Sequence, residues 1–196
     1  MGSSRLQARV VLSRLVAALL LGGAGRALVL RAPELAEGVY LRLDEAISLF
    51  AALMLGAPLG ALTSLVATVG TPEPAFSSLW AIEALLVGLA VNRGAPTVLS
   101  VVAYWMLVGA LFGSGLLPTP ALQIDPRMLL AKQVINGALS GVLAHLAATS
   151  PSIRRLFRAA SPPKAASLRT QLARALVPVS AVPVILLGLG LGRMYS

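Results

Sequence analysis

Three polar side chains interrupt an otherwise apolar stretch of this chain at residues 129–145. Lys132, Gln133 and Asn136 lie near the start of the sequence LLAKQVINGALSGVLAH. An ammonium group and two amides donate hydrogen bonds, and the amide oxygens also accept them. Burying such groups without partners costs free energy, so they need a reason to be there. We therefore treat this stretch as a candidate ligand-binding face.

Further residues capable of specific chemistry lie on two other apolar stretches. Trp80 and Glu83 belong to residues 78–92, and Tyr104 and Trp105 belong to residues 96–113. If residues 78–92 and 127–149 enter a membrane from the same side, Glu83 and Lys132 reach a similar depth, about 7 Å below the start of the helix. An acid and a base at one depth can offset their burial by pairing. The sequence therefore predicts an outward-facing pocket for a small polar or heteroaromatic ligand, with the following ligand-binding residues: Lys132, Glu83, Asn136, Gln133, Trp105, Tyr104 and Trp80.

Structural roles are the alternative for the same residues. Lys132 can extend to the lipid headgroups, or pair with Glu83 only to fix the helix register. Trp80 also fits the aromatic belt at a membrane interface. Tyr104 and Trp105 fit core packing better than ligand contact.

No pattern in the sequence indicates catalysis or a metal centre. The chain has no cysteine, which excludes thiol catalysis and thiolate zinc sites, and its one histidine, His145, cannot form a metal site alone. Motifs for metalloproteases, phosphate-binding loops or a serine with a matching histidine base are absent. Asp44 and Glu45 open an apolar stretch, where a helix N-terminus favours negative charge, so we interpret them as capping residues. We predict no enzymatic activity, no cofactor and no metal.

The composition favours a membrane protein. Of the 196 residues 57% are hydrophobic and 12% are charged, a balance outside that of soluble globular domains. Apolar stretches that approach the length of a membrane span, about 20 residues, are 10–30, 44–56, 58–70, 78–92, 96–113, 127–149 and 172–192. The second and third form one run, divided at Gly56-Ala57-Pro58 because glycine can leave helical geometry and proline lacks an amide donor. A signal peptide is the alternative for the first stretch, and an uncleaved helix is favoured by its length and by Arg14.

The distribution of charge predicts the orientation. With this division the N-terminus is cytoplasmic, ten of the 16 lysines and arginines lie on the inner side, and all seven acidic residues lie in the outer half. The basic segment RRLFRAASPPKAASLRTQLAR, residues 154–174, lacks the interleaved aromatic side chains that stack on nucleic-acid bases. Attraction to anionic lipid headgroups therefore explains its positive charge better than binding to nucleic acid. We expect an all-α, polytopic helical bundle in a bacterial inner membrane, with a six-helix bundle at residues 1–150, a basic cytoplasmic loop at 151–171 and a seventh transmembrane helix at 172–196.

Part of this pattern resembles a known family. The stretch AISLFAALMLGAPLGALTSLVATVG followed by PAFSSLWAIEALLVGLAVNRGAP resembles the substrate-binding S components of energy-coupling factor vitamin importers, over about residues 40–150. The resemblance implies a six-helix core with a ligand site near the outer surface. It also implies that Ala18 and Gly22, two small residues four apart, contact a transmembrane partner.

The end of the chain departs from that family, because a basic loop and a seventh apolar stretch follow. With LLAKQVINGALSGVLAHLAA and LRTQLARALVPVSAVPVILLGLGLG, the whole arrangement is similar to the N-terminal membrane region of bacterial sensor histidine kinases and diguanylate cyclases. This similarity implies the input module of a signal-transduction protein. The alternatives are an importer S component and a non-catalytic membrane assembly subunit. The partners expected are a small-molecule ligand, the lipid bilayer, and either a membrane partner subunit or a second copy in a homodimer.

Overall fold

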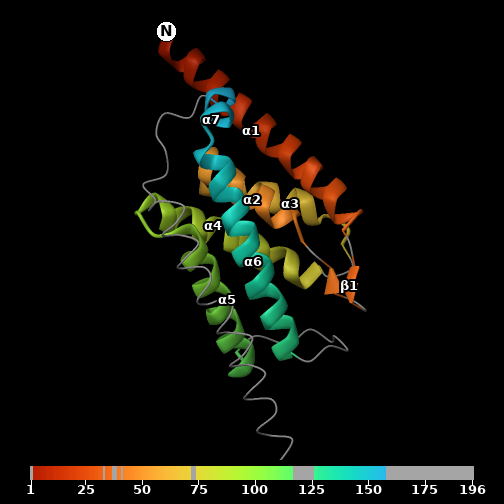
Figure 1. The fold of residues 1–196 in the computed structure, drawn as a ribbon. Coiled ribbons are helices and arrows are strands. Elements are labelled where there is room, and N and C mark those ends of the chain that lie inside the picture. Colours follow the sequence, from red (N-terminus) through yellow and green to blue (C-terminus); the bar gives the residue numbers. More distant parts are fainter. Residues whose placement is uncertain are drawn as a thin grey trace, which may run out of the picture.

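The computed structural model describes residues 2–32, 34–36, 39–40, 42–71, 74–116 and 126–157, most of which are helical (Figure 1). The helices are α1 (Gly2–Val29), α2 (Asp44–Met54), α3 (Ala57–Thr68), α4 (Pro74–Asn92), α5 (Thr97–Gly113), α6 (Pro126–Thr149) and α7 (Pro151–Leu156). Strands β1 (Glu34–Ala36) and β2 (Val39–Tyr40) form a small antiparallel hairpin. The predicted all-α class is confirmed apart from this hairpin, whose strands are too short to show an alternating pattern in the sequence.

The helices of the described part follow the predicted order. Helices α2 to α6 begin and end within four residues of the predicted limits, whereas α1 begins at Gly2 rather than at residue 10. The short helix α7 occupies the start of the predicted basic loop. The rest of that loop beyond residue 157, and the predicted seventh helix at 172–192, lie outside the described residues.

The predicted division of the long apolar run is confirmed. Helix α2 ends at Met54 and α3 begins at Ala57. Between them Gly56 adopts a φ of +115°, which an L side chain rarely adopts, so glycine permits the turn. Pro58 follows in the first turn of α3, where no backbone donor is required. The chain reverses there and α3 packs back on α2.

Helix α2 occupies the centre of the bundle. It contacts α1, α3, α4 and α6, while α3 also packs against α1 and α4, and α5 packs against α4 and α6. Figure 1 shows two ends of the bundle. The start of α1, the α2–α3 turn, the α4–α5 turn and α7 lie toward the upper left, and we call this the basic end. The β1–β2 hairpin lies at the right, and the end of α5 and the start of α6 lie at the bottom; we call this the hairpin end.

Small residues allow close approach of the helix axes. A Cβ atom at Gly60 of α3 would overlap the Cβ of Ala52 on α2, and one at Gly22 of α1 would lie 2.6 Å from the Cβ of Val66. Ala18 is fully buried, and its carbonyl accepts a 3.2 Å hydrogen bond from the hydroxyl of Thr63 on α3. The resemblance implied that Ala18 and Gly22 face a partner protein. They instead pack against α3 of the same chain, because their small side chains let the two backbones meet.

One helix of the described part, Gln7–Val29, is long and apolar enough to cross a membrane by length and composition. A signal sequence near an N-terminus passes the same test, and so does the core helix of a soluble protein. The helices Ala57–Thr68, Phe76–Asn92 and Thr97–Gly113 are apolar but shorter.

Gly60→Ala is expected to destabilise the fold by about 1–3 kcal/mol, because the added methyl group overlaps Ala52 in a tight helix contact. Gly23→Ala is the matched control, since Gly23 is helical and no neighbouring atom lies within 4 Å of the position that its Cβ would take. That control should be neutral or stabilising by up to about 1 kcal/mol. The measurement is the melting temperature of each purified variant in thermal unfolding. Equal melting temperatures for Gly60→Ala and Gly23→Ala would contradict the close α2–α3 contact.

Candidate functional site

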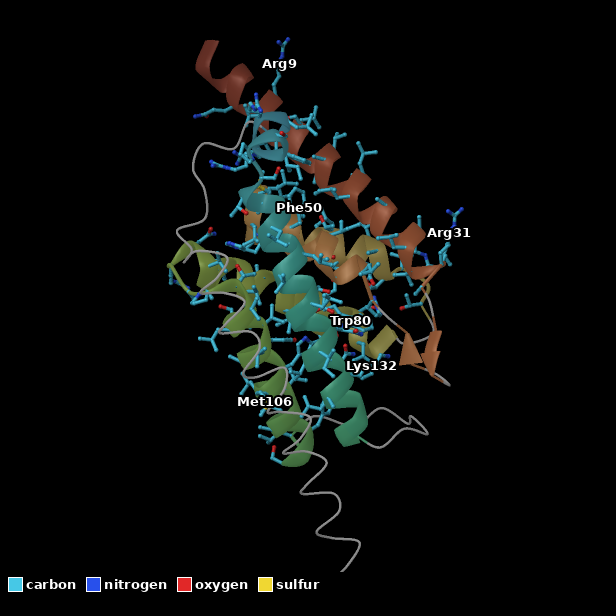
Figure 2. The ribbon with its side chains drawn as sticks, viewed as in Figure 1. Arg9, Arg31, Phe50, Trp80, Met106 and Lys132 are labelled. Atoms are coloured by element: carbon cyan, nitrogen blue, oxygen red, sulfur yellow. The ribbon has the colours of Figure 1, made fainter. Side chains whose placement is uncertain are left out.

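A set of buried polar and charged side chains lies between α2, α4, α5 and α6. We call it the polar cluster, and its members are Arg42, Asp44, Glu45, Trp80, Glu83, Trp105, Gln133, Asn136 and Ser140. They come from the start of α2, the first half of α4, the middle of α5 and the middle turns of α6. Figure 2 labels Trp80 in this region, with Lys132 at nearly the same level along the bundle.

Arg42 links three of these helices. Its Nε donates to Asp44 Oδ1 at 2.9 Å and its Nη2 donates to Asp44 Oδ2 at 2.5 Å, which is the bidentate geometry of a strong charged pair. The guanidinium carbon lies 3.6 Å from the ring centroid of Trp80, a cation–π contact with α4. The hydroxyl of Ser140 on α6 donates to the Arg42 carbonyl at 3.3 Å.

Two carboxyl groups meet deeper in the cluster. Glu83 Oε1 accepts a 2.9 Å hydrogen bond from Trp105 Nε1, which joins α4 to α5. The side chain of Glu45 on α2 contacts that of Glu83. A carboxylate only accepts hydrogen bonds, so this contact joins two acceptors unless one of them carries a proton.

Gly137 of α6 makes room for these groups. A Cβ atom there would lie 2.9 Å from Glu45 Oε1, 2.5 Å from Val101 Cγ1 and 3.1 Å from Trp105 Cδ1. The carboxyl group of Glu45 therefore lies directly against the α6 backbone. Any side chain at position 137 would displace it.

Several polar atoms of the cluster are buried and have no hydrogen-bond partner among the described residues. They are both amide atoms of Gln133 and Nε1 of Trp80, whereas the carboxyl oxygens of Glu45 have only the Glu83 carboxyl group beside them. Gln133 is only 1% exposed and lies one helical turn before Gly137, so it faces the same interior. Buried groups of this kind are normally bonded, because leaving them unpaired costs about 1–3 kcal/mol each. These atoms are the ones that a polar ligand could bond.

The structure buries most of the predicted site residues. Trp80, Glu83, Trp105, Gln133 and Asn136 are buried members of the polar cluster. The hydrogen bond that Trp105 donates to Glu83 goes beyond the packing role that the sequence favoured for this tryptophan.

Tyr104 has a packing role in the structure. Its hydroxyl donates to the Leu79 carbonyl on α4 at 2.6 Å, and its ring meets Trp105 edge to face at 5.3 Å. Lys132 is half-buried and has an interaction partner. Glu83 contacts Trp105 and Glu45 and interacts electrostatically with Arg42. The predicted Lys132–Glu83 pair is not among these interactions and stays a prediction.

Sequence reasoning missed Arg42 and Glu45 as members of the site, and gave Asp44 and Glu45 a capping role. Both acids do lie in the first turn of α2, but the side chain of Asp44 binds Arg42 and that of Glu45 points between α4 and α6. The available signal was three charged residues within four positions, RLDE, at the start of an apolar helix. That signal gives no indication of which helices would surround them.

An apolar groove of about 400 Å³ lies elsewhere, between α1, α2, α6 and α7. Leu21, Phe50, Leu143, Ile153 and Phe157 are among its lining residues, which are all apolar. It offers no group that could orient a polar ligand. His145 is buried nearer this end of α6, and the described residues contain no group of three or more histidines, cysteines or acids placed to hold a metal ion.

Comparisons with protein-family models, with curated proteins and with solved structures found no match to this chain.

Arg42→Met is expected to destabilise the fold by about 3–5 kcal/mol, because it leaves the Asp44 carboxylate buried and unpaired. Adding Asp44→Asn should restore part of this loss, so the two changes should be strongly non-additive in a double-mutant cycle of unfolding free energies. Arg93→Met is the control: Arg93 is exposed at the end of α4, and its loss should change stability by less than about 0.5 kcal/mol. Additive effects of the two cluster mutations would contradict the pairing.

Proposed function

We propose that this protein is an integral membrane helical bundle that binds a small molecule at the polar cluster, on the outer side of the membrane, without catalysing a reaction. Two independent properties of the fold support this function. One is the contrast between its outer surface and its interior, and the other is the set of unpaired polar atoms within the cluster.

The outer surface supports the membrane location. On α6 the exposed residues Ile135, Leu139, Leu143 and Leu146 form an apolar stripe, while Gln133, Asn136 and Ser140 are buried. The helices of a soluble protein show the reverse arrangement, with apolar residues inward and polar residues outward. A continuous apolar surface is unfavourable in water and favourable in lipid.

Helix α4 repeats this arrangement. Ile82, Leu86 and Leu89 are exposed, whereas Trp80 and Glu83 are buried. Charged residues inside such a surface are expensive and characteristically face the interior of a bundle, where they form functional sites.

The short helices are compatible with this location. At about 1.5 Å per residue, the 11 residues of α2 and the 12 of α3 extend only about 17 and 18 Å, less than the roughly 30 Å of a hydrocarbon core. Broken spans of this kind are tolerated at membrane depth where other helices of the protein enclose them. Here α1, α4 and α6 do so.

The charges at the basic end support the proposed orientation. Arg9, Arg14, Arg93, Arg154 and Arg155 belong to the starts or ends of helices that meet at the basic end, which we assign to the cytoplasm. The hairpin end, and with it the polar cluster, then faces outward. Figure 2 shows Arg9 at the basic end, far from Trp80.

The observation that carries ligand binding is the burial of Gln133 with both of its amide atoms unpaired. A ligand that bonds these atoms favours the conformation in which it does so, and this differential affinity is what a sensor requires. We therefore propose the input module of a bacterial signal-transduction protein. An importer S component is the alternative, and it would need a docking surface other than Ala18 and Gly22. A non-catalytic assembly subunit is the third candidate, and it would leave these polar atoms unexplained.

The orientation can be tested with single cysteines, because the natural chain has none. Ser114→Cys at the end of α5 should react with a membrane-impermeant maleimide in intact cells, and Ser152→Cys on α7 should react only after lysis, since both positions are exposed but lie at opposite ends. Labelling is read by the mass shift of the protein. Equal labelling of both positions in intact cells would contradict the proposed orientation.

Ligand binding can be tested by native mass spectrometry of the protein purified from its membrane. Gln133→Leu should lower the occupancy of a co-purifying small molecule, with affinity reduced about tenfold if one or two hydrogen bonds are lost. Thr68→Val is the control, because Thr68 is also buried and its hydroxyl donates to the carbonyls of Ser64 and Leu65 within α3. A wild-type protein that retains no small molecule but holds a second membrane subunit would favour the assembly role instead.

A further inference from the structure

We infer that the apolar groove between α1, α2, α6 and α7 holds an acyl chain of an anionic phospholipid, whose phosphate contacts arginines of α1 and α7. This lipid site is separate from the polar cluster. The inference rests on the membrane location proposed above, because a bilayer supplies such molecules. Three properties of the groove support it: its small lining residues, its opening to the surface, and the charge at its end.

Small side chains give the groove room. Ala46 on α2 and Ala144 and Ala147 on α6 line it together with larger residues, among them Leu21 and Phe50. Its volume of about 400 Å³ lies within the range of roughly 300–1,000 Å³ for small-molecule sites. Apolar cavities stay dry and bind apolar molecules instead. In a membrane, the apolar molecules that surround the groove are the acyl chains of lipids.

The groove opens to the outer surface of the bundle. Leu143 on α6 and Leu156 on α7, which both line it, are 39% and 78% exposed. Phe50 is buried and meets Phe157 edge to face, with the ring centroids 5.4 Å apart. An acyl chain can therefore enter sideways from the bilayer and lie against these rings.

Positive charge lies beside the groove on α7. Arg154 and Arg155 stand between Ile153 and Leu156, both of which line the groove. Arg155 is exposed, and its Nε donates to the Pro151 carbonyl at 3.4 Å. A guanidinium has five N–H donors, so Arg155 can also bond a phosphate. Arg154 is half-buried and has an interaction partner, and it adds its charge to this end of the groove.

Helix α1 brings a third arginine to the same end. Phe157, just after α7, packs on a cluster that includes the buried Ala18. Arg14 is exposed and precedes Ala18 by four residues, so it lies one helical turn nearer the basic end on the same face of α1. Leu21 follows Arg14 by two turns, shares this face and lines the groove. Arg14 and Arg155 therefore approach one end of the groove from two helices.

Acidic residues do not offset this charge. The sequence has no aspartate or glutamate before Glu34 or after Asp125, so α1, α6 and α7 contain none. The acids of α2, Asp44 and Glu45, belong to the polar cluster. Arginines bind phosphate by paired hydrogen bonds, and basic pockets on the cytoplasmic side of a membrane bind anionic headgroups. A zwitterionic headgroup would bring a further cation to these arginines and fits less well.

The test compares phosphatidylglycerol and phosphatidylcholine with the same oleoyl chains. Native mass spectrometry of the full-length protein in detergent counts the bound lipids as each is titrated. We expect one saturable phosphatidylglycerol adduct, bound at least about tenfold more tightly than phosphatidylcholine, since each arginine near an anionic headgroup contributes about fivefold.

Two variants address the two parts of the site. Arg14→Gln combined with Arg155→Gln should weaken phosphatidylglycerol binding at least about tenfold and leave phosphatidylcholine binding unchanged. Ala147→Leu places a larger side chain in the groove and should weaken the binding of both lipids. Arg14 and Arg155 are exposed, so the paired arginine variant tests the inference even if Ala147→Leu does not fold.

Matched controls change the same residue types away from the groove. Arg9→Gln combined with Arg93→Gln removes two exposed arginines from the basic end, and Ala103→Leu enlarges an exposed alanine on α5. Both should keep the binding of the wild-type protein. An equal loss in the control arginine pair and in the Arg14 and Arg155 pair would overturn the site, because bulk charge would then explain the preference.

Other outcomes would also overturn the inference. Equal binding of the two lipids would exclude selection of an anionic headgroup. A dimer that is lost in Ala147→Leu would indicate that a second copy of the chain covers the groove.

The lipid site and the proposed function fail separately. Gln133→Leu should leave the phosphatidylglycerol adduct unchanged while it lowers the occupancy of a molecule bound at the polar cluster. Recovery of the protein from cells in the soluble fraction, without detergent, would overturn the membrane location and the lipid site together. Recovery in the membrane fraction without a preference for phosphatidylglycerol would overturn the lipid site alone.

Discussion

The compensation of buried charge is the constraint on which the interior of this protein depends. Arg42, Asp44, Glu45 and Glu83 lie within a bundle whose outer surface is rich in leucine, isoleucine and valine. In such surroundings a single unpaired charge costs several kcal/mol, so each charged group must find an opposite charge, a hydrogen-bond partner or a ligand. The Arg42–Asp44 pair satisfies this requirement within the protein, and it holds the start of α2 against α4 through Trp80 and against α6 through Ser140.

Close helix packing makes this arrangement possible. Gly60 lets α3 lie against α2, and Gly137 leaves space on α6 for the Glu45 carboxyl group. Without these glycines the helix axes would separate, and the interior groups would lose the contacts that compensate them. The same small residues that allow tight packing therefore also place the candidate ligand site.

The polar cluster and the apolar groove between α1, α2, α6 and α7 differ in the kind of ligand that each can recognise. The groove bordered by Phe50 and Phe157 presents only apolar atoms, which favour any apolar occupant equally. The polar cluster presents acceptors at fixed positions beside indole rings, so it can discriminate by charge and by hydrogen-bond pattern. This difference is the reason that the functional proposal concentrates on Gln133 and the polar cluster.

The sequence by itself determined where helices α2 to α6 lie and where the long apolar run is divided, because hydrophobic length, proline and glycine act locally at positions such as Gly56 and Pro58. It also indicated that Glu83, Gln133 and Asn136 would be buried, since polar residues in apolar helices have few other places to go. Only the tertiary structure decided that Arg42 and Glu45 join them, that Ala18 and Gly22 face α3, and that Trp105 bonds Glu83. Those outcomes depend on which helix faces meet across the bundle, and contacts between residues far apart in the chain leave no local pattern in the sequence.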